Sequence, residues 1–219
     1  MVKRLYASGL LSKYPWDIVV SFIFRNRSKA KDISNNFVLE VGFGTGNNLW
    51  FAAREGFQVS GIEASISAVE IAKKRFKDDS LVGDLRLGNF TKLPFEDDSF
   101  DIAFDRHSLA CVNKENQIKS INEIKRCLNL GGKFLFTGYA DNHTSMHSGH
   151  LSKCGMTTNI IAGSLVGVGD IAFINIDDIN QFFKNGWKLL SVEKVEKVNL
   201  INNKNTIHSE WHVIAEKIN

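Results

Sequence analysis

Residues 38–46 read Val-Leu-Glu-Val-Gly-Phe-Gly-Thr-Gly, a short apolar run that ends in glycines at every second position. The aliphatic side chains of Val38, Leu39 and Val41 are typical of a buried strand. The glycines allow the backbone to turn sharply and to approach a ligand without side-chain obstruction. Residues 47–54 then predict a helix whose amino end points at the same place. A strand, a glycine turn and a helix amino terminus together predict a nucleotide-binding corner.

The spacing of the glycines separates two kinds of nucleotide site. The dinucleotide fingerprint places its third glycine where this chain has Asn47, whereas here Gly46 comes one residue early and Glu40 lies inside the strand. This pattern, E-x-G-x-G-x-G, resembles motif I of the class I S-adenosylmethionine (SAM) methyltransferases. The resemblance implies that Gly42, Gly44 and Gly46, with Glu40 and Asn47 beside them, surround the methionine and ribose part of SAM. The alternative is a tight strand-to-helix turn with no ligand.

A second carboxylate follows the next apolar run, residues 57–62. Glu63 stands roughly 20 residues past the glycine turn, where nucleotide-binding folds place the residue that holds the ribose hydroxyls. An ionised carboxylate only accepts hydrogen bonds, so it can take both vicinal hydroxyls at once. We therefore predict that Glu63, with Ala64 beside it, binds the cofactor. An acid that favours the dipole of the following helix is the alternative.

Three further segments continue the resemblance: Gly88–Phe90, Leu93–Phe95 and Asp98–Asp101. Where the family has an Asp that meets the adenine amino group, this chain has Asn89, whose amide oxygen can accept the same hydrogen bond. Phe90 would give the adenine an apolar face, with plain core packing as the alternative.

Residues 101–107 predict the fourth strand, which ends in Asp105, Arg106 and His107. Open α/β sheets bind ligands outside the carboxyl ends of their strands, so this end and the acids above should meet in one crevice. The resemblance implies that the backbone near Asp105 meets the methionine amino group, so Asp105 and Arg106 are predicted to bind the cofactor. Arg106 either binds a substrate carboxylate or phosphate through its fork, or pairs with Asp105.

The remaining elements predict an α/β fold, a Rossmann-like doubly wound seven-stranded sheet with an antiparallel last strand in a three-layer α/β/α arrangement. The last two strands lack an intervening helix, which predicts an antiparallel hairpin at the sheet edge. The class I methyltransferases end this way, and a nicotinamide dehydrogenase does not. The expected elements are helices over 65–76, 113–128 (ended by Gly131-Gly132) and 177–184, and strands over 85–87, 133–139, 188–198 and 207–217.

We expect one methyltransferase domain over residues 1–219. Residues 1–36 contain an apolar helical stretch from Trp16 to Phe24, which predicts an N-terminal helical lid or a helix that packs on the sheet. Residues 140–175 are rich in Gly, Ser, Thr, Asn and His, and they follow the fifth strand. A long insertion of this kind is usually functional or disordered, and we predict a substrate cap.

Methyl transfer from a sulfonium is an in-line displacement, in which holding the acceptor close to the methyl carbon does much of the work. A hydroxyl or thiol acceptor also profits from a general base, and histidine suits neutral pH. His107 and His143 are our catalytic candidates, because both follow strand ends, and Tyr139 is the candidate that orients the acceptor. For each histidine the alternative is a hydrogen-bonding or surface role.

The spacings of His143, His147, His150 and Cys154 suit zinc ligands only if the segment is a helix. Gly149 and the Ser/Thr content of this segment argue against a helix, so no metal is predicted.

Charge, hydropathy and cysteine spacing limit the partners and the location that we expect for this protein. The net charge of +3 is spread along the chain and no basic–aromatic interleaving occurs, so a nucleic-acid partner is not expected. No apolar run can span a bilayer, no signal peptide is evident, and three cysteines without C-x-x-C spacing predict a cytoplasmic protein. We expect a monomer or homodimer that uses SAM, yields S-adenosylhomocysteine (SAH) and methylates a small molecule. The alternatives are a SAM-binding non-catalytic module or sensor, and an NAD-dependent oxidoreductase.

Overall fold

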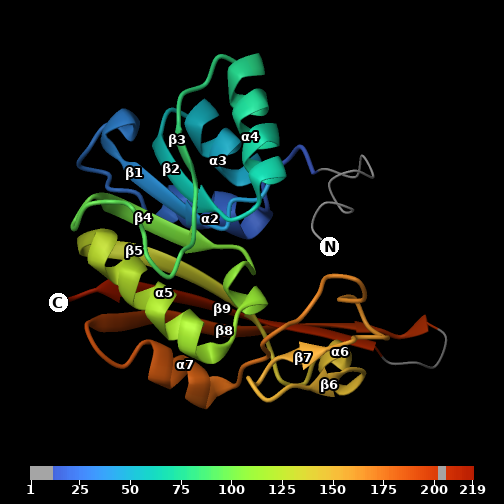
Figure 1. Cartoon of the computed structure of the whole chain (residues 1–219). Helices are drawn as coiled ribbons and strands as arrows, with labels where there is room; N and C mark the ends of the chain where they lie inside the picture. The colour runs from blue at the N-terminus through green and yellow to red at the C-terminus, as the bar shows by residue number, and fades with distance from the viewer. Residues whose placement is uncertain (1–11, 202–205) are drawn as a thin grey trace.

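The computed structural model describes residues 12–201 and 206–219. In that part of the chain the main sheet has seven strands: β1 (Phe37–Val41), β2 (Gln58–Glu63), β3 (Asp84–Leu87), β4 (Phe100–Asp105), β5 (Leu128–Tyr139), β8 (Trp187–Asn199) and β9 (Thr206–Lys217). Their order is β3-β2-β1-β4-β5-β9-β8 (Figure 1). The strands from β1 to β5 pair in parallel, and β9 is antiparallel to both β5 and β8. The predicted doubly wound sheet with an antiparallel last strand is confirmed.

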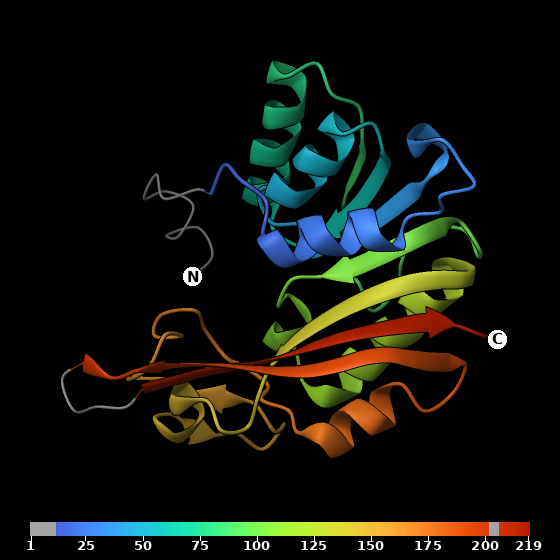
Figure 2. The same cartoon turned by 180° about the vertical axis from the view of Figure 1, so that it is seen from behind.

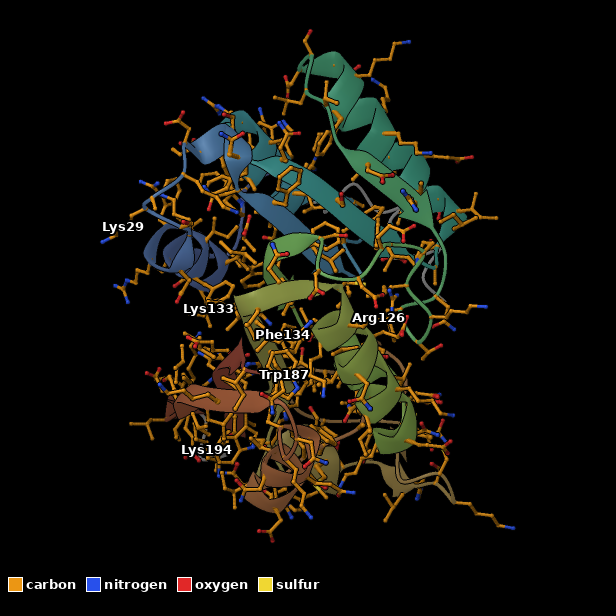
Figure 3. All side chains as sticks on the ribbon, turned by 90° about the vertical axis from the view of Figure 1, so that its left-hand side faces the viewer. Lys29, Arg126, Lys133, Phe134, Trp187 and Lys194 are labelled. Atoms are coloured by element: carbon orange, nitrogen blue, oxygen red, sulfur yellow. The ribbon has the colours of Figure 1, made fainter. Side chains whose placement is uncertain are left out.

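Helices cover the two faces of the sheet and bury separate apolar clusters. The clusters contain residues of α2 (Asp17–Asn26), α3 (Asn47–Arg54) and α4 (Ile66–Asp78) on one face, and of α5 (Lys114–Cys127) and α7 (Ile176–Phe182) on the other. Helices α5 and α7 face the viewer in Figure 1, and α2 faces the viewer in Figure 2, where the molecule is seen from behind. On the α5 side, the rings of Phe134 and Trp187 lie 5.9 Å apart (Figure 3). These layers place the carboxyl ends of β1, β2 and β4 at one edge of the sheet, where α3 begins.

Local sequence explains where several helices begin and end. Ser65 accepts a hydrogen bond from the Ala68 amide at the start of α4, and Asn113 does the same for α5, as their cap chemistry predicts. The predicted helix end at Gly131-Gly132 is wrong. Helix α5 ends at Cys127, because Leu128 is already extended and pairs with Phe100 of β4.

The segment 140–175 leaves the carboxyl end of β5 and lies beside the long β8–β9 hairpin (Figure 1). It contains a short helix α6 (Thr144–His147) and a two-stranded sheet of β6 (His150–Leu151) and β7 (Thr157–Thr158). Its own small core packs against Ala110, in the 3-10 turn η2 (Leu109–Cys111) that follows β4. This position over the strand ends is the one that a substrate cap needs, and the cap itself stays a prediction.

The helix of the N-terminal part packs on the sheet, and its role as a lid stays a prediction. A second 3-10 turn, η1 (Ile33–Asn35), leads into β1, and the body of α2 buries Val19, Phe22 and Ile23 against the sheet. Trp16, just before α2, reaches the open edge of the sheet. Residues 1–11 of the predicted lid lie outside the described residues. Within the described ranges, no helix is both long enough and apolar enough to cross a bilayer.

Candidate functional site

A cavity of about 580 Å³ opens at the carboxyl edge of β1, β2 and β4. The glycine loop, the ends of these strands, β5 and the cap all contribute to its wall. The lining residues are Trp16, Glu40, Gly42, Phe43, Gly44, Thr45, Asn47, Asn48, Glu63, Ala64, Phe90, Arg106, His107, Ser108, Cys111, Val112, Tyr139, Val168 and Ile171. The predicted crevice therefore exists, and most of the predicted site residues line it.

The glycine loop has the backbone that its sequence requires. Gly42 has φ +69°, and a Cβ built there would lie 2.1 Å from the Cβ of Ser108, so no side chain fits. Gly46 has φ +74° and begins α3, and its missing side chain allows close contact with Ala72 of α4. Gly46 therefore packs helices together, while Gly42 and Gly44 face the cavity.

Glu63 connects the glycine loop to the next helix. One carboxylate oxygen accepts from the Gly44 amide at 2.9 Å, and the other accepts from the Ser65 amide at 2.8 Å. Each oxygen keeps a further lone pair for a ligand hydroxyl. Glu63 thus combines two functions, because it holds the loop in shape and presents a fixed acceptor to the cavity.

Two buried carboxylates have an oxygen without a hydrogen-bond donor among the described residues, Glu40 Oε2 and Asp105 Oδ2. Glu40 lines the cavity, whereas Asp105 is fully buried and is not among the lining residues. Burial raises the pKa of Glu40 to about 8, although the amide of Asn48 donates to its other oxygen at 2.7 Å. Burial also raises the pKa of Asp105 to about 6, against the hydrogen bonds from Ser108 and Leu109. Buried acids with free oxygens favour a cationic ligand, which restores their charged forms.

The structure separates the two residues predicted to receive adenine. Phe90 and Ala64 line the cavity. Asn89 is not among the lining residues, and its amide oxygen accepts from the Thr91 amide and hydroxyl at 2.9 and 3.0 Å. Adenine recognition by Asn89 stays a prediction. Asn47 lines the cavity, and its side-chain amide donates to the Tyr14 carbonyl at 2.8 Å.

Arg106 does not form the predicted alternative pair with Asp105, whose carboxylate turns toward Ser108 and Leu109. The guanidinium carbon of Arg106 instead lies 4.2 Å from the centre of the Trp16 ring. Its Nε has no partner among the described residues. Arg106 and Trp16 also line a second cavity, of about 400 Å³, between α2 and the β8–β9 hairpin.

His107 and Tyr139 lie together in the cavity wall, and their rings stack at 4.1 Å between centroids and 3° between planes. Nε2 of His107 lies 3.0 Å from Oε2 of Glu210, a residue of β9 that sequence analysis missed. No local pattern marks Glu210, because it reaches the site through strand pairing with Tyr139 across 71 positions. Burial raises the pKa of Tyr139 above its usual range, so this side chain stays neutral.

The other histidine candidate lies outside the cavity wall. His143 is fully buried and begins α6, where its Nδ1 accepts from the Ser145 amide at 2.9 Å. Burial lowers the pKa of His143 to about 4. Its ring lies edge-on to Tyr139 with centroids 5.7 Å apart. No group of three or more His, Cys, Asp or Glu side chains is arranged to hold a metal in the described ranges.

Comparison with known proteins adds independent findings. Residues 39–136 match the methyltransferase domain family. The chain is 31% identical over 103 residues to the sarcosine/dimethylglycine N-methyltransferase of Aphanothece halophytica, covering 46% of this chain and 36% of that protein. It is 30% identical over 103 residues to the sterol 4-C-methyltransferase strm-1 of Caenorhabditis elegans, covering 46% and 30%.

A solved SAM-dependent methyltransferase from Methanosarcina mazei superposes with a TM-score of 0.74 and 16% identity, covering 94% of this chain and 99% of that one. At this identity the structural likeness shows the fold alone. The matched region spans about a third of the length of the two curated relatives, so the similarity does not identify the methyl acceptor of this chain.

Proposed function

We propose that this chain, which belongs to the class I SAM-dependent methyltransferases, transfers a methyl group to a small-molecule acceptor held between the glycine-loop cavity and the cap. SAM is the cofactor of this family and SAH its product. The observation that carries the proposal is one continuous cavity, lined by the glycine loop and Glu63 at one end and by His107, Tyr139 and Ile171 at the other.

The residues of the cavity fit SAM. Its cationic methionine end matches Glu40, which lines the cavity and has an oxygen without a donor among the described residues, and the nearby charge of Asp105 adds to this attraction. Glu63 has acceptor capacity left for the ribose hydroxyls. Phe90 supplies an apolar surface for the adenine. When bound, SAM supplies an electrophilic methyl carbon.

The acceptor end of the cavity has the groups that methyl transfer needs. Tyr139 and the cap residues Val168 and Ile171 give this end a largely apolar wall. His107 is the base candidate, because it lines the same wall and its ring is held by stacking and by Glu210. One matched relative is named for methylating the nitrogen of sarcosine and dimethylglycine and the other for methylating a sterol carbon, so an amine is the first heteroatom acceptor to test, with a hydroxyl and a thiol beside it.

Calorimetry with SAM, SAH and NAD tests the cofactor assignment. We expect SAM and SAH to bind the wild type and NAD not to bind. Glu63→Ala should weaken SAM binding by roughly 100-fold, since it removes charge-assisted hydrogen bonds. Glu70→Ala, on the exposed face of α4, is the matched control and should bind as the wild type does. Binding of NAD alone, or no SAM binding at millimolar concentration, would refute the proposal.

Transfer of a labelled methyl group tests the activity. Sarcosine, catechol and dithiothreitol are suitable probes, because they offer an amine, a hydroxyl and a thiol. We expect turnover with at least one of them. SAM binding without transfer to any of these three classes would favour the non-catalytic SAM module instead.

A further inference from the structure

Glu210 is a buried carboxylate at the centre of a polar cluster beside the cavity. Only 5% of it is exposed. Its oxygens lie 3.0 Å from Nε2 of His107, 2.8 Å from Nε2 of His212 and 3.4 Å from Nε2 of His208. The nearest guanidinium nitrogen of Arg106 lies at 3.8 Å. One acid therefore contacts three of the six histidines of the chain.

The cluster continues from His208 toward the surface. Nδ1 of His208 lies 2.7 Å from the Ser164 hydroxyl and 3.2 Å from Nε2 of His143. Because Nδ1 of His143 accepts the Ser145 amide, its Nε2 carries the proton and donates within the cluster. The side chain of His208 is 28% exposed and borders a surface hollow that Lys197 also lines. A hydrogen-bonded path thus joins the cavity wall to solvent.

The charge of Glu210 sets the direction of these bonds. Burial alone would raise the pKa of Glu210, but hydrogen bonds from His208 and His212 and the charge of Arg106 hold it well below its usual range. An ionised carboxylate only accepts, so Nε2 of His107 must donate to it. Arg106 also approaches this nitrogen at 3.3 Å, but the contact with Glu210 is shorter.

Nδ1 of His107 is then the ring nitrogen that can accept a proton. With a proton on Nε2, the neutral ring has a bare lone pair on Nδ1. Nδ1 has no hydrogen-bond partner among the described residues, and His107 lines the cavity. A carboxylate that fixes the tautomer of a histidine and stabilises its protonated form is the arrangement that makes histidine an effective base.

We propose that Glu210 is the positioning residue that makes Nδ1 of His107 the general base, and that the acceptor is a molecule whose attacked oxygen, sulfur or nitrogen carries a proton. This inference rests on the proposed function. As the bond from the acceptor heteroatom to the methyl carbon forms and the sulfonium carbon–sulfur bond breaks, the proton of the heteroatom passes to Nδ1. The imidazolium then donates from Nε2 to the ionised Glu210, whose charge stabilises it, and the ring releases the added proton from Nδ1 to water once the methylated product has left the cavity.

The surroundings of His107 are few and can be named. Tyr139 stacks on its ring, and Cys111 lies with its Sγ 3.7 Å from the His107 carbonyl. Burial raises the pKa of Cys111 to about 11, so this thiol stays neutral. Among residues 12–201 and 206–219, the charged side chains that contact the ring are Arg106 and Glu210.

Nitrogen NMR of the histidine rings tests the proposal without any acceptor. In the wild type with SAH bound, we expect the ¹⁵N shifts of His107 to show the Nε2–H tautomer. Glu210→Gln should give a mixture of both tautomers, because an amide can accept or donate. Glu193→Gln is the matched control, since Glu193 lines the second cavity together with Glu210 but has no contact with His107. It should keep the wild-type tautomer.

Kinetics with the probe that gives turnover supply the second measurement. Glu210→Gln should lower kcat by about 100-fold, leave SAH affinity within about twofold and move the acid limb of the pH–rate profile to lower pH. Glu193→Gln should change none of these.

The wild-type spectrum tests the proposal even if Glu210→Gln does not fold. An Nδ1–H tautomer of His107 in the wild type would overturn the proposal. An unchanged tautomer or unchanged kcat in a folded Glu210→Gln variant would overturn it as well. Failure of the proposed function looks different, since the wild type would then either not bind SAM and SAH, or bind SAM without transferring its methyl group.

Discussion

The half of the molecule around β1–β4 and the half formed by β5, β8, β9 and the cap contribute to the same cavity in different ways. In the first half, each cofactor residue stands at a strand end beside its own motif. Gly44 and Glu63, for example, follow consecutive strands and meet through one hydrogen bond. In the second half, the site depends on pairing between distant segments, as in Tyr139 with Glu210. The proposed cofactor residues are therefore marked by local motifs, whereas Glu210 reaches the cavity wall through strand pairing.

The two halves also differ in charge. The cofactor end contains Glu40, Glu63 and Asp105 close enough that both other acids raise the pKa of Glu40. The acceptor end has one acid, Glu210, surrounded by imidazoles and Arg106. The acids of the first arrangement favour a cationic ligand, whereas the charge of Glu210 in the second is already balanced by Arg106 and the imidazole donors. Perturbing each half should therefore change different measurements.

The largest effect is expected at the glycine loop. Gly42→Ala should lower the free energy of unfolding by roughly 2–5 kcal/mol, because it adds overpacking to backbone strain. SAM affinity should fall with it, because the clash at 2.1 Å lies in the cavity wall. Chemical denaturation measures the first effect and calorimetry the second.

Gly131→Ala is the matched control for this change. Gly131 has φ +77°, close to that of Gly42, but a Cβ there meets nothing within 4 Å. It should cost only the strain of the left-handed backbone, about 1–2 kcal/mol, and leave SAM affinity intact. Equal losses in the two variants would show that strain rather than close packing constrains the loop.

The part of the site around β1–β4 could be predicted from sequence better than the part formed by β5, β8, β9 and the cap. Glu40, Glu63 and Phe90 were found because strand-end motifs have fixed spacing, and they do line the cavity. Glu210 was missed because sequence carries no strand register. His143 and His107 both follow strand ends, which made them equal candidates. The cap, however, buries the His143 side chain next to His208, away from the cavity wall. The helix end placed at Gly131 failed because pairing of Leu128 with β4 outweighed the local glycine signal.

A smaller effect is expected from pH, and it concerns the cofactor half alone. Binding of a cation favours the ionised forms of Glu40 and Asp105, whose pKa values burial raises to about 8 and about 6. Binding therefore releases protons, and affinity rises with pH up to about 8. SAM affinity should increase roughly tenfold between about pH 6 and 8, and that of SAH, which lacks the sulfonium charge, by about threefold at most.

Calorimetry in buffers of different ionisation enthalpy measures this proton release directly. Glu40→Gln should abolish most of the pH dependence. The same variant should raise the stability of the ligand-free chain at high pH, because stability from a carboxyl with a raised pKa is lost as pH rises through that pKa. A pH-independent SAM affinity in the wild type would show that the acids do not face the cationic end of the cofactor.

The smallest effect is expected in the cap. Val168 is 41% exposed and lines the cavity. Val168→Ala removes two methyl groups that are about half buried, so the KM of the accepted probe should rise by about fourfold. SAM affinity and kcat should stay unchanged, since Val168 lies at the acceptor end. Val166→Ala, at a residue that is 54% exposed and does not line the cavity, is the matched control and should change nothing. A change in SAM affinity with an unchanged KM would assign this part of the cap to the cofactor and remove the division between the two halves.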